Sequence, residues 1–424
     1  MANISGILKL GISRQAKNIA IYTFANFFNK GVSFLLLFYF AHVLTENDFG
    51  MLNLFSNGIL FLMPFISMGI LQSASTEYFK LDKKEFKTFF STTLLMPVAV
   101  MLLAIGVLFF FKDQLQQRYA FPSIFIIVIP VITLFNFLNE HLINMVRNSN
   151  NAVKYLFVNG GRLLTEIVLA VFFISAMGMG WTGRVLGIFI SFLFVAGYAI
   201  FYFSEQKFIF GKISKKYFYS ELQYSLPIIL MQFGIFCMGS SAGYFIQYFT
   251  HDYAAVGIFS IAATFGSIIL VMSSALTQYV YPQIYSLLSE ASVNYKAIRK
   301  HFIFFAAAML CCTLAVIIAT PLAYSIILKP SYAPGLSYFY FICTGYFFWA
   351  ISYFFYAFML YNKEKKKLLL ISLLSIILSF VLHSLFIKLL GVKGAAVSMC
   401  VTYFIIMITT IAFVYKEFIK VFKS

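Results

Sequence analysis

Long apolar segments alternate with short polar connections along almost the whole chain. A membrane-spanning helix needs roughly 20 predominantly apolar residues, and the sequence contains twelve such segments. Backbone in lipid must satisfy its own hydrogen bonds, and the segments lack the alternation of barrel strands, so we predict helices. The predicted spans lie near residues 18–42, 49–73, 88–111, 121–146, 155–177, 182–203, 223–248, 254–280, 301–327, 337–361, 368–390 and 394–416.

The composition supports the same interpretation. Of the 424 residues, 62% are hydrophobic and 11% are charged, whereas soluble domains have about 45–50% apolar and about 25% charged residues. A water-soluble fold could not bury so much apolar surface. Twelve spans also leave little chain outside the bilayer, which excludes a large soluble catalytic domain. We therefore expect an all-α integral membrane protein that is not an enzyme.

The net charge of +17 is distributed in the pattern of a membrane topology. In a soluble protein this charge would suggest nucleic acid, but here the basic residues gather in every second connection, so we expect no nucleic-acid partner. Because Lys and Arg are enriched in cytoplasmic connections, we predict that both termini are cytoplasmic. The basic clusters are Lys9, Arg14 and Lys17; Lys80, Lys83, Lys84 and Lys87; Arg147 and Lys154; Lys207, Lys212, Lys215 and Lys216; Lys296, Arg299 and Lys300; Lys363, Lys365, Lys366 and Lys367; and Lys416, Lys420 and Lys423. The opposite connections hold Lys112, Arg118, Arg184, Lys329, Lys388 and Lys393.

Two pairs of similar turns indicate an internal repeat. A short acidic turn precedes Gly50, and a similar turn precedes Gly257, which lies 207 positions later. Gly180-Trp181-Thr182-Gly183 and Gly391-Val392-Lys393-Gly394 are 211 positions apart. We therefore predict a duplicated six-helix unit, with lobes 1–210 and 211–424 related by a pseudo-twofold axis along the membrane normal.

The sequence carries no motif for nucleotide, metal or redox chemistry. Gly211-Lys212 lacks the preceding glycine and the following Ser or Thr of a P-loop. The five cysteines lie in apolar segments and form no CxxC pair. We assign no catalytic residue, no metal and no cofactor, and we expect a protein that moves a substrate.

Lys30 is the first candidate for the substrate path. A charge at the bilayer centre costs at least ~2.5–3.5 kcal/mol, so it marks a functional position. Lys30 follows Lys17 by thirteen positions, about 20 Å of helix, which places it near the middle of the first span. Asn26 and Asn29 share its polar face. We expect these three residues to line a hydrated path and bind substrate; the alternative is hydrogen bonding between packed helices.

Four further residues inside predicted spans are candidates. Glu140 and Arg162 each lie about seven residues from the inner ends of the fourth and fifth spans, so an antiparallel hairpin predicts that they interact. Glu166 follows Arg162 by one helical turn. We predict that Arg162 binds substrate and that Glu140, Glu166 and His383 couple transport to an ion. The alternatives are a structural buried ion pair and a packing role for His383.

The opening of the chain resembles a known family. Phe28-Asn29-Lys30-Gly31, Phe40-Ala41, Leu44 and Asp48-Phe49-Gly50 are similar to the start of Wzx-type O-antigen translocases. These belong to the multidrug/oligosaccharidyl-lipid/polysaccharide exporter superfamily. The number of spans, the charges of the connections and the Gly-x-x-Gly turns extend the resemblance over essentially the whole chain.

The resemblance implies a flippase of the bacterial inner membrane that works in lipopolysaccharide biosynthesis. Its substrate would be an undecaprenyl-pyrophosphate-linked oligosaccharide, moved from the inner to the outer leaflet by ion-coupled alternating access. Lys30 and Arg162 match the cation-rich cavity that the family implies. Membrane lipid and other glycan-assembly proteins would be partners. The alternatives are a multidrug antiporter that binds organic cations through Glu140 or Glu166, and a membrane glycan polymerase or ligase, which the short outer connections disfavour.

Overall fold

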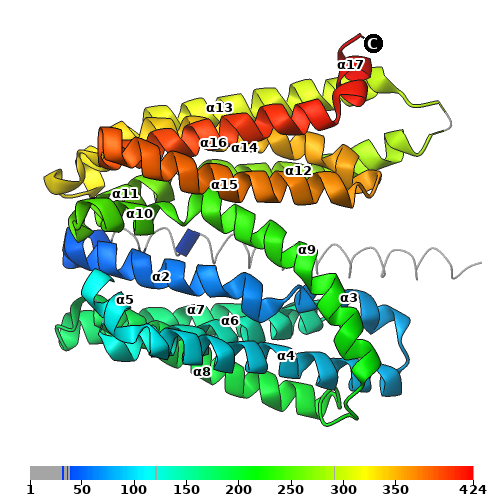
Figure 1. The fold of residues 1–424 in the computed structure, drawn as a ribbon, viewed down its shortest axis with the longest axis horizontal. Coiled ribbons are helices and arrows are strands. Elements are labelled where there is room, and N and C mark those ends of the chain that lie inside the picture. Colours follow the sequence, from blue (N-terminus) through cyan, green and yellow to red (C-terminus); the bar gives the residue numbers. More distant parts are fainter. Residues whose placement is uncertain (1–30, 33–35, 37–38, 120–121, 291, 424) are drawn as a thin grey trace, which may run out of the picture. The chain divides into compact units, whose positions relative to one another are not determined.

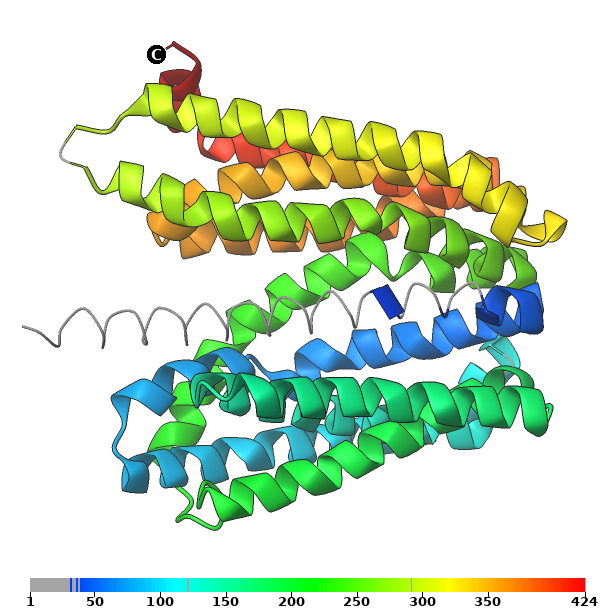
Figure 2. The same cartoon turned by 180° about the vertical axis from the view of Figure 1, so that it is seen from behind.

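The described chain is built of helices, and no strand occurs in it (Figures 1 and 2). The computed structural model describes residues 31–32, 36, 39–119, 122–290 and 292–423. Within these residues, 11 helices are long and apolar enough to cross a membrane. They correspond to the second to twelfth predicted spans, whereas most of the first span, 18–42, lies outside the described residues. The prediction of an all-α integral membrane protein is confirmed.

The helices of the first half follow the predicted order, with a short additional helix, α5, between the third and fourth spans. The bounds are α2 Glu46–Ser67, α3 Ile70–Lys80, α4 Lys83–Phe110, α5 Lys112–Tyr119, α6 Ser123–Asn148, α7 Ala152–Val171, a π-helix at Phe172–Ala176 and α8 Gly180–Glu205.

The second half ends in a short helix, α17, that follows the last span. The bounds are α9 Lys215–Gly239, α10 Ala242–Thr250, α11 Tyr253–Gly266, α12 Ile268–Leu288, α13 Tyr295–Ile327, a 3-10 helix at Pro330–Tyr332, α14 Gly335–Tyr361, α15 Lys365–Leu390, α16 Val392–Phe413 and α17 Tyr415–Lys423.

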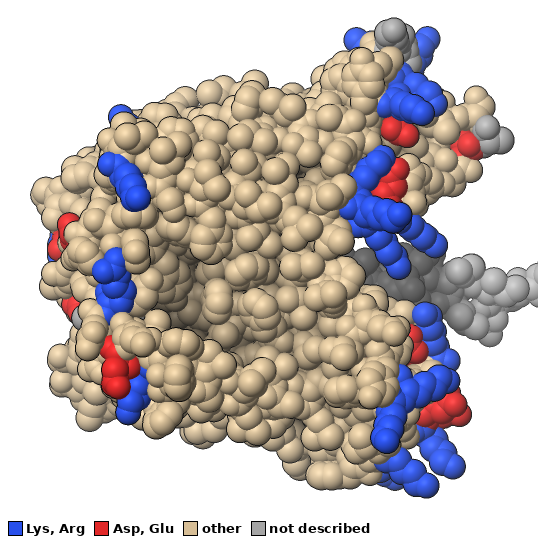
Figure 3. Space-filling model, in the orientation of Figure 1, with Lys and Arg blue, Asp and Glu red and all other residues tan. Residues whose placement is uncertain are grey.

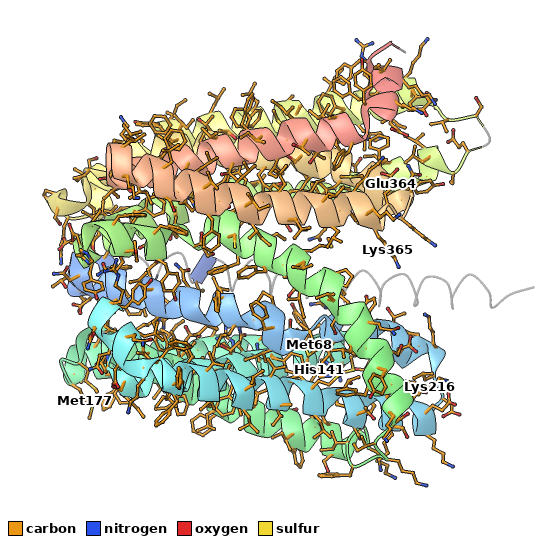
Figure 4. The ribbon with its side chains drawn as sticks, viewed as in Figure 1. Met68, His141, Met177, Lys216, Glu364 and Lys365 are labelled. Atoms are coloured by element: carbon orange, nitrogen blue, oxygen red, sulfur yellow. The ribbon has the colours of Figure 1, made fainter. Side chains whose placement is uncertain are left out.

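Three predicted spans are interrupted helices. The second span divides into α2 and α3 at Met68 and Gly69, which have φ angles of 47° and 73° (Figure 4). The seventh divides into α9 and α10 at Ser240 and Ser241, and the eighth divides into α11 and α12 at Ser267. The apolar pattern runs through each break without interruption, so it predicts the span and not the break.

The helices form two compact units. Unit 1 holds Gly58–Ile229 together with the described residues up to Leu44. Unit 2 holds Thr45–Asn57 and Leu230–Ser424. The predicted lobes, 1–210 and 211–424, follow the sequence repeat, whereas the units divide inside α2 and α9. Each of these helices therefore contributes one part to each unit.

In each unit, the packing comes both from antiparallel helices and from helices two spans apart, which run parallel. In unit 1, α8 packs against α6 and α7, and α4 packs against α6. In unit 2, α16 packs against α14 and α15, and α11, α12 and α13 pack against α14. On the face drawn in Figure 3, Lys and Arg gather at the ends of the helices and leave an uncharged band between. This distribution is expected of helices that cross a bilayer.

Inside unit 2, the first turns of α2 cross α11 with their backbones in contact. A Cβ atom added to Gly50 would lie 1.9 Å from the carbonyl oxygen of Tyr253. A Cβ atom added to Gly257 would lie 2.1 Å from the carbonyl oxygen of Glu46. Glycine is required at both positions, because small residues allow helices to approach this closely.

This crossing is reciprocal under the sequence repeat. Glu46 and Tyr253 are 207 positions apart, as are Gly50 and Gly257. The contact from Glu46 to Gly257 therefore recurs as the contact from Tyr253 to Gly50. A twofold relation between the two segments produces this pattern, so the geometry supports the repeat that the sequence predicts.

The two Gly-x-x-Gly turns are also built alike. Gly180 and Gly391 begin them with φ angles of 56° and 59°, a left-handed backbone that glycine adopts at little cost. The closing glycine packs against the preceding helix in both turns: Gly183 against Phe173, and Gly394 against Phe386. The second pair of similar sequences thus folds into a second pair of similar structures.

Gly257→Ala is expected to lower the stability of the purified protein by ~1–3 kcal/mol, since the new methyl group overfills a backbone contact. Gly197→Ala is the matched control, because a Cβ atom there would meet nothing within 4 Å. Thermal unfolding in detergent compares the two variants. Equal unfolding midpoints would show that the crossing is not close-packed.

Candidate functional site

Three charged side chains form one cluster inside unit 1. Glu166 of α7 accepts from Arg162 of the same helix, with 2.5 Å between Oε2 and Nη1. It also accepts from Arg184 of α8, with 2.5 Å between Oε1 and Nη2. Side-chain exposure is 9% for Glu166, 17% for Arg162 and 15% for Arg184. We call Arg162, Glu166 and Arg184 the arginine–carboxylate cluster; two guanidinium cations share one carboxylate, which leaves one net positive charge.

Aromatic rings hold both guanidinium groups in place. Arg162 lies over Phe192, with 4.9 Å from Cζ to the ring centroid. Arg184 lies over Phe40, with 4.8 Å from Cζ to the centroid. Cations over ring faces are attracted by the ring quadrupole, more strongly where water is excluded. The cluster is therefore fixed by packing as well as by its ion pairs.

The tight turn between α7 and α8 brings the cluster together. The π-helix Phe172–Ala176 ends α7, and Gly178 and Gly180 reverse the chain with φ angles of 65° and 56°. Glu166 lies twelve positions before Gly178 and Arg184 lies six positions after it, so their hydrogen bond joins residues at different levels of the antiparallel hairpin. Sequence analysis assigned Arg184 to an outer connection; the structure instead places it inside α8.

Glu140 and Arg162 interact through their charges, but the structure does not bring them into an ion pair. Arg162 pairs with Glu166, and no ion pair joins it to Glu140 among the described residues. Glu140 is exposed on α6. Similar depth is not sufficient for contact, because Arg162 is directed toward Phe192 of α8. An ion-coupling role for Glu140 or Glu166 stays a prediction.

The two membrane histidines are enclosed by aromatic side chains. His141 lies among the helices of unit 1 (Figure 4) and stacks between Phe90 and Phe137, at centroid distances of 4.6 and 5.4 Å. His383 is buried in unit 2, where its Nδ1 is hydrogen-bonded to Ser398 and its ring packs on Phe245. These contacts favour packing, and ion coupling by His383 stays a prediction.

Sequence analysis also missed Glu221, a buried carboxylate near the start of α9. Glu221 is 3% exposed and accepts a hydrogen bond of 2.8 Å from the hydroxyl of Ser73. Ser73 lies in α3, just after the break at Gly69, and Gly69 packs against Ile228 of α9. The contact ties α3 to α9, a pairing that residue spacing alone does not predict.

The first predicted candidates lie outside the described residues. These are Asn26, Asn29 and Lys30. In the described part of the chain, no group of three or more His, Cys, Asp and Glu could hold a metal ion. The arginine–carboxylate cluster is therefore the candidate site that the structure describes.

A groove between α7 and α8 reaches the cluster at Arg162. Its volume is about 280 Å³, and its lining includes Lys154 and Arg162 with Phe157, Val158, Phe194 and Tyr198. No acidic side chain lines it. Lys154 and Arg162 are eight positions apart on α7, which is about 12 Å along a helix. The groove thus combines an apolar wall with two cations, as a ligand with an anionic head and an apolar chain requires.

The model of one protein family matches residues 15–288, and its description is "Polysaccharide biosynthesis protein". A comparison with curated proteins finds no match. Among solved structures, the chain is similar to an inward-facing multidrug resistance MATE family transporter of the MOP superfamily. The identity is 15%, the TM-score is 0.70, and 92% of this chain and 95% of that chain are covered.

A second similar structure is the MATE multidrug transporter DinF-BH in complex with R6G. Its TM-score is 0.65 at 15% identity, with 96% of each chain covered. At such identity these structures show the fold. MATE transporters have twelve helices in two lobes, so the predicted fold class is confirmed.

The ion pair between Arg184 and Glu166 is expected to stabilise the protein. In a double-mutant cycle of Arg184→Gln and Glu166→Gln, we expect a coupling energy of ~0.5–3 kcal/mol from unfolding in detergent. The more exposed pair of Lys80 and Glu77 is the control, with an expected coupling of ~0.2–1 kcal/mol. The prediction would be contradicted if the losses of unfolding free energy in the two single variants simply added in the double variant.

Proposed function

The chain belongs to the polysaccharide biosynthesis protein family, and we propose that it is a flippase for lipid-linked oligosaccharides. It is a multi-pass membrane protein with the fold of MOP superfamily transporters. The proposed substrate is an undecaprenyl-pyrophosphate-linked O-antigen repeat unit, which moves from the inner to the outer leaflet of the bacterial inner membrane. The proposed mechanism is ion-coupled alternating access, with both termini in the cytoplasm.

The positive charge of the described site is the observation that carries this proposal. A pyrophosphate needs fixed cations in a membrane, because moving an unpaired charge into hydrocarbon is costly. The arginine–carboxylate cluster has one net positive charge, and the lining of the groove includes Lys154 and Arg162 but no acidic side chain. Arginine also matches the geometry of phosphate oxygens.

A multidrug antiporter for organic cations is the second candidate, because the similar solved structures are multidrug transporters. Such a protein would bind its ligand through an acidic residue. Glu166 is already occupied by two guanidinium groups, and Glu140 is exposed on α6. The occupation of Glu166 favours an anionic ligand over a cationic one.

Deletion of the gene is expected to abolish the surface glycan while lipid-linked units accumulate on the inner leaflet. Sensitivity to cationic dyes should stay unchanged. Glycan blots of whole cells, together with dye-sensitivity assays, measure both properties in one strain. A deletion strain with normal glycan and increased dye sensitivity would support the multidrug antiporter instead.

Lys30 is proposed to contact the pyrophosphate with Asn26 and Asn29. Lys30→Arg is expected to retain much of the transport, because it keeps the charge and adds bidentate phosphate geometry. Lys30→Gln should insert normally but fail to restore the glycan, and Lys30→Glu should be worse. Complementation of the deletion strain, with membrane levels as the control, measures these effects.

The competing explanation is that Lys30 only pairs with Glu166. The double variant Lys30→Glu with Glu166→Lys separates the two explanations. Recovery of the glycan by this variant would reject substrate contact. We expect no recovery, since Glu166 already has two cationic partners.

A further inference from the structure

The arginine–carboxylate cluster has more hydrogen-bond donors than it uses. A guanidinium group carries five N–H donors and no acceptor. The Nε atom of Arg162 and the Nη1 atom of Arg184 are buried and have no hydrogen-bond partner in the described part of the chain. A buried donor without a partner is costly. The cluster therefore lacks oxygen acceptors for two donors, and it also carries one uncompensated positive charge.

The groove supplies a route by which an anionic ligand could reach Arg162. Arg162 belongs to both the cluster and the groove lining. Three hydroxyl groups lie in the lining: Thr165 donates to Gly161, Ser191 donates to Ile188, and Tyr198 supplies the third. An anion in the groove would therefore meet Arg162 and Lys154.

Glu166 occupies the place beside the guanidinium groups that such an anion would need. Its two oxygens each take one guanidinium group, and a carboxylate and a phosphate bind guanidinium groups in the same forked geometry. A phosphate that binds Arg162 through the groove competes with Glu166 for the same donors. The protein thus contains its own competitor for the anion site.

We propose that Glu166 is a displaceable counter-ion. In the ligand-free protein it neutralises part of the charge of Arg162 and Arg184, and the phosphate of an amphiphilic ligand displaces it from Arg162. When Glu166 returns to Arg162, it expels the ligand. The identity of the ligand as a lipid-linked pyrophosphate rests on the proposed function above, whereas the competition itself rests on the geometry of the cluster.

A built-in competitor lowers affinity and favours turnover. Without it, two uncompensated guanidinium groups would hold a phosphate tightly, and release would be slow. When Glu166 is present, the binding free energy of the ligand is only the difference between the interaction of the ligand with the guanidinium groups and that of Glu166 with the same groups. A transporter needs binding of this kind, because a ligand held too firmly is not delivered.

Glu166→Gln in the purified full-length protein tests the proposal, because the amide keeps the size of the side chain and removes its charge. The probes are inorganic pyrophosphate and farnesyl pyrophosphate, with binding measured by calorimetry in detergent. We expect the variant to bind both probes at least ~5-fold more tightly than the wild type, a usual size for coupling between sites. We also expect pyrophosphate to raise its unfolding temperature more than that of the wild type.

Glu364→Gln is the matched control, because Glu364 also forms an ion pair with a basic side chain but lies in unit 2. Its affinity for both probes should equal that of the wild type. Stronger binding of farnesyl pyrophosphate than of inorganic pyrophosphate would assign the apolar chain to the groove. A further loss of that difference in Phe194→Ala would confirm the assignment.

A purely structural role of Glu166 predicts different measurements. If Glu166 is only a scaffold, Glu166→Gln will be less stable, pyrophosphate will not restore its stability, and affinity will be unchanged or weaker. Absence of binding in both the wild type and the variant would equally overturn the proposal. If Glu166→Gln does not fold, Glu166→Asp applies the same test, because its shorter side chain cannot reach both guanidinium groups.

The proposed function can fail separately from this inference. Tighter binding by Glu166→Gln, combined with normal surface glycan in the deletion strain, would keep the counter-ion and reject the glycan substrate. Loss of glycan in the deletion strain, combined with unchanged affinity in Glu166→Gln, would keep the flippase and reject the counter-ion.

Discussion

The hydrocarbon core of a bilayer offers no hydrogen-bonding partners, and this constraint acts on both the backbone and the charged side chains of the chain. Backbone groups in lipid must bond within their own segment, which leaves helices as the available structure for these spans. Charged side chains face the same demand and must find partners inside the protein. The arginine–carboxylate cluster meets the demand only in part, because two of its buried donors have no partner in the described chain. That shortage is what makes the cluster a candidate binding site rather than a simple structural ion pair.

The spans could be predicted from the sequence because insertion into lipid depends on the average hydrophobicity of about twenty residues. Breaks inside a span depend on single backbone angles, so Met68 and Gly69 left no trace in the apolar pattern. The repeat could be predicted from the sequence for another reason. Gly50 and Gly257 occupy a backbone contact that tolerates no side chain, and a requirement of that kind leaves the same residue at both copies.

The site was harder to predict than the fold, since it depends on the direction of side chains. Depth along a helix follows from residue counting, and on that basis Glu140 and Arg162 were paired. The two residues do interact through their charges, but direction around the helix prevents an ion pair, because Arg162 is directed toward α8. Arg184 was overlooked since a basic residue near a turn resembles a connection residue. Counting outward from the turn after α7 would not have paired Arg184 with Glu166 either, because Arg184 lies six positions after Gly178 and Glu166 lies twelve positions before it.

The reciprocal crossing of α2 and α11 has an evolutionary consequence. Because Glu46 meets Gly257 as Tyr253 meets Gly50, one kind of contact is made twice with the partners exchanged. In a six-helix ancestor, before duplication, two identical chains would have made this contact across a symmetric dimer interface, with a single glycine codon serving both sides. Fusion into one chain then freed each copy to change alone. The crossing has glycine on both sides, whereas the arginine–carboxylate cluster occurs in one copy, on its fifth and sixth spans.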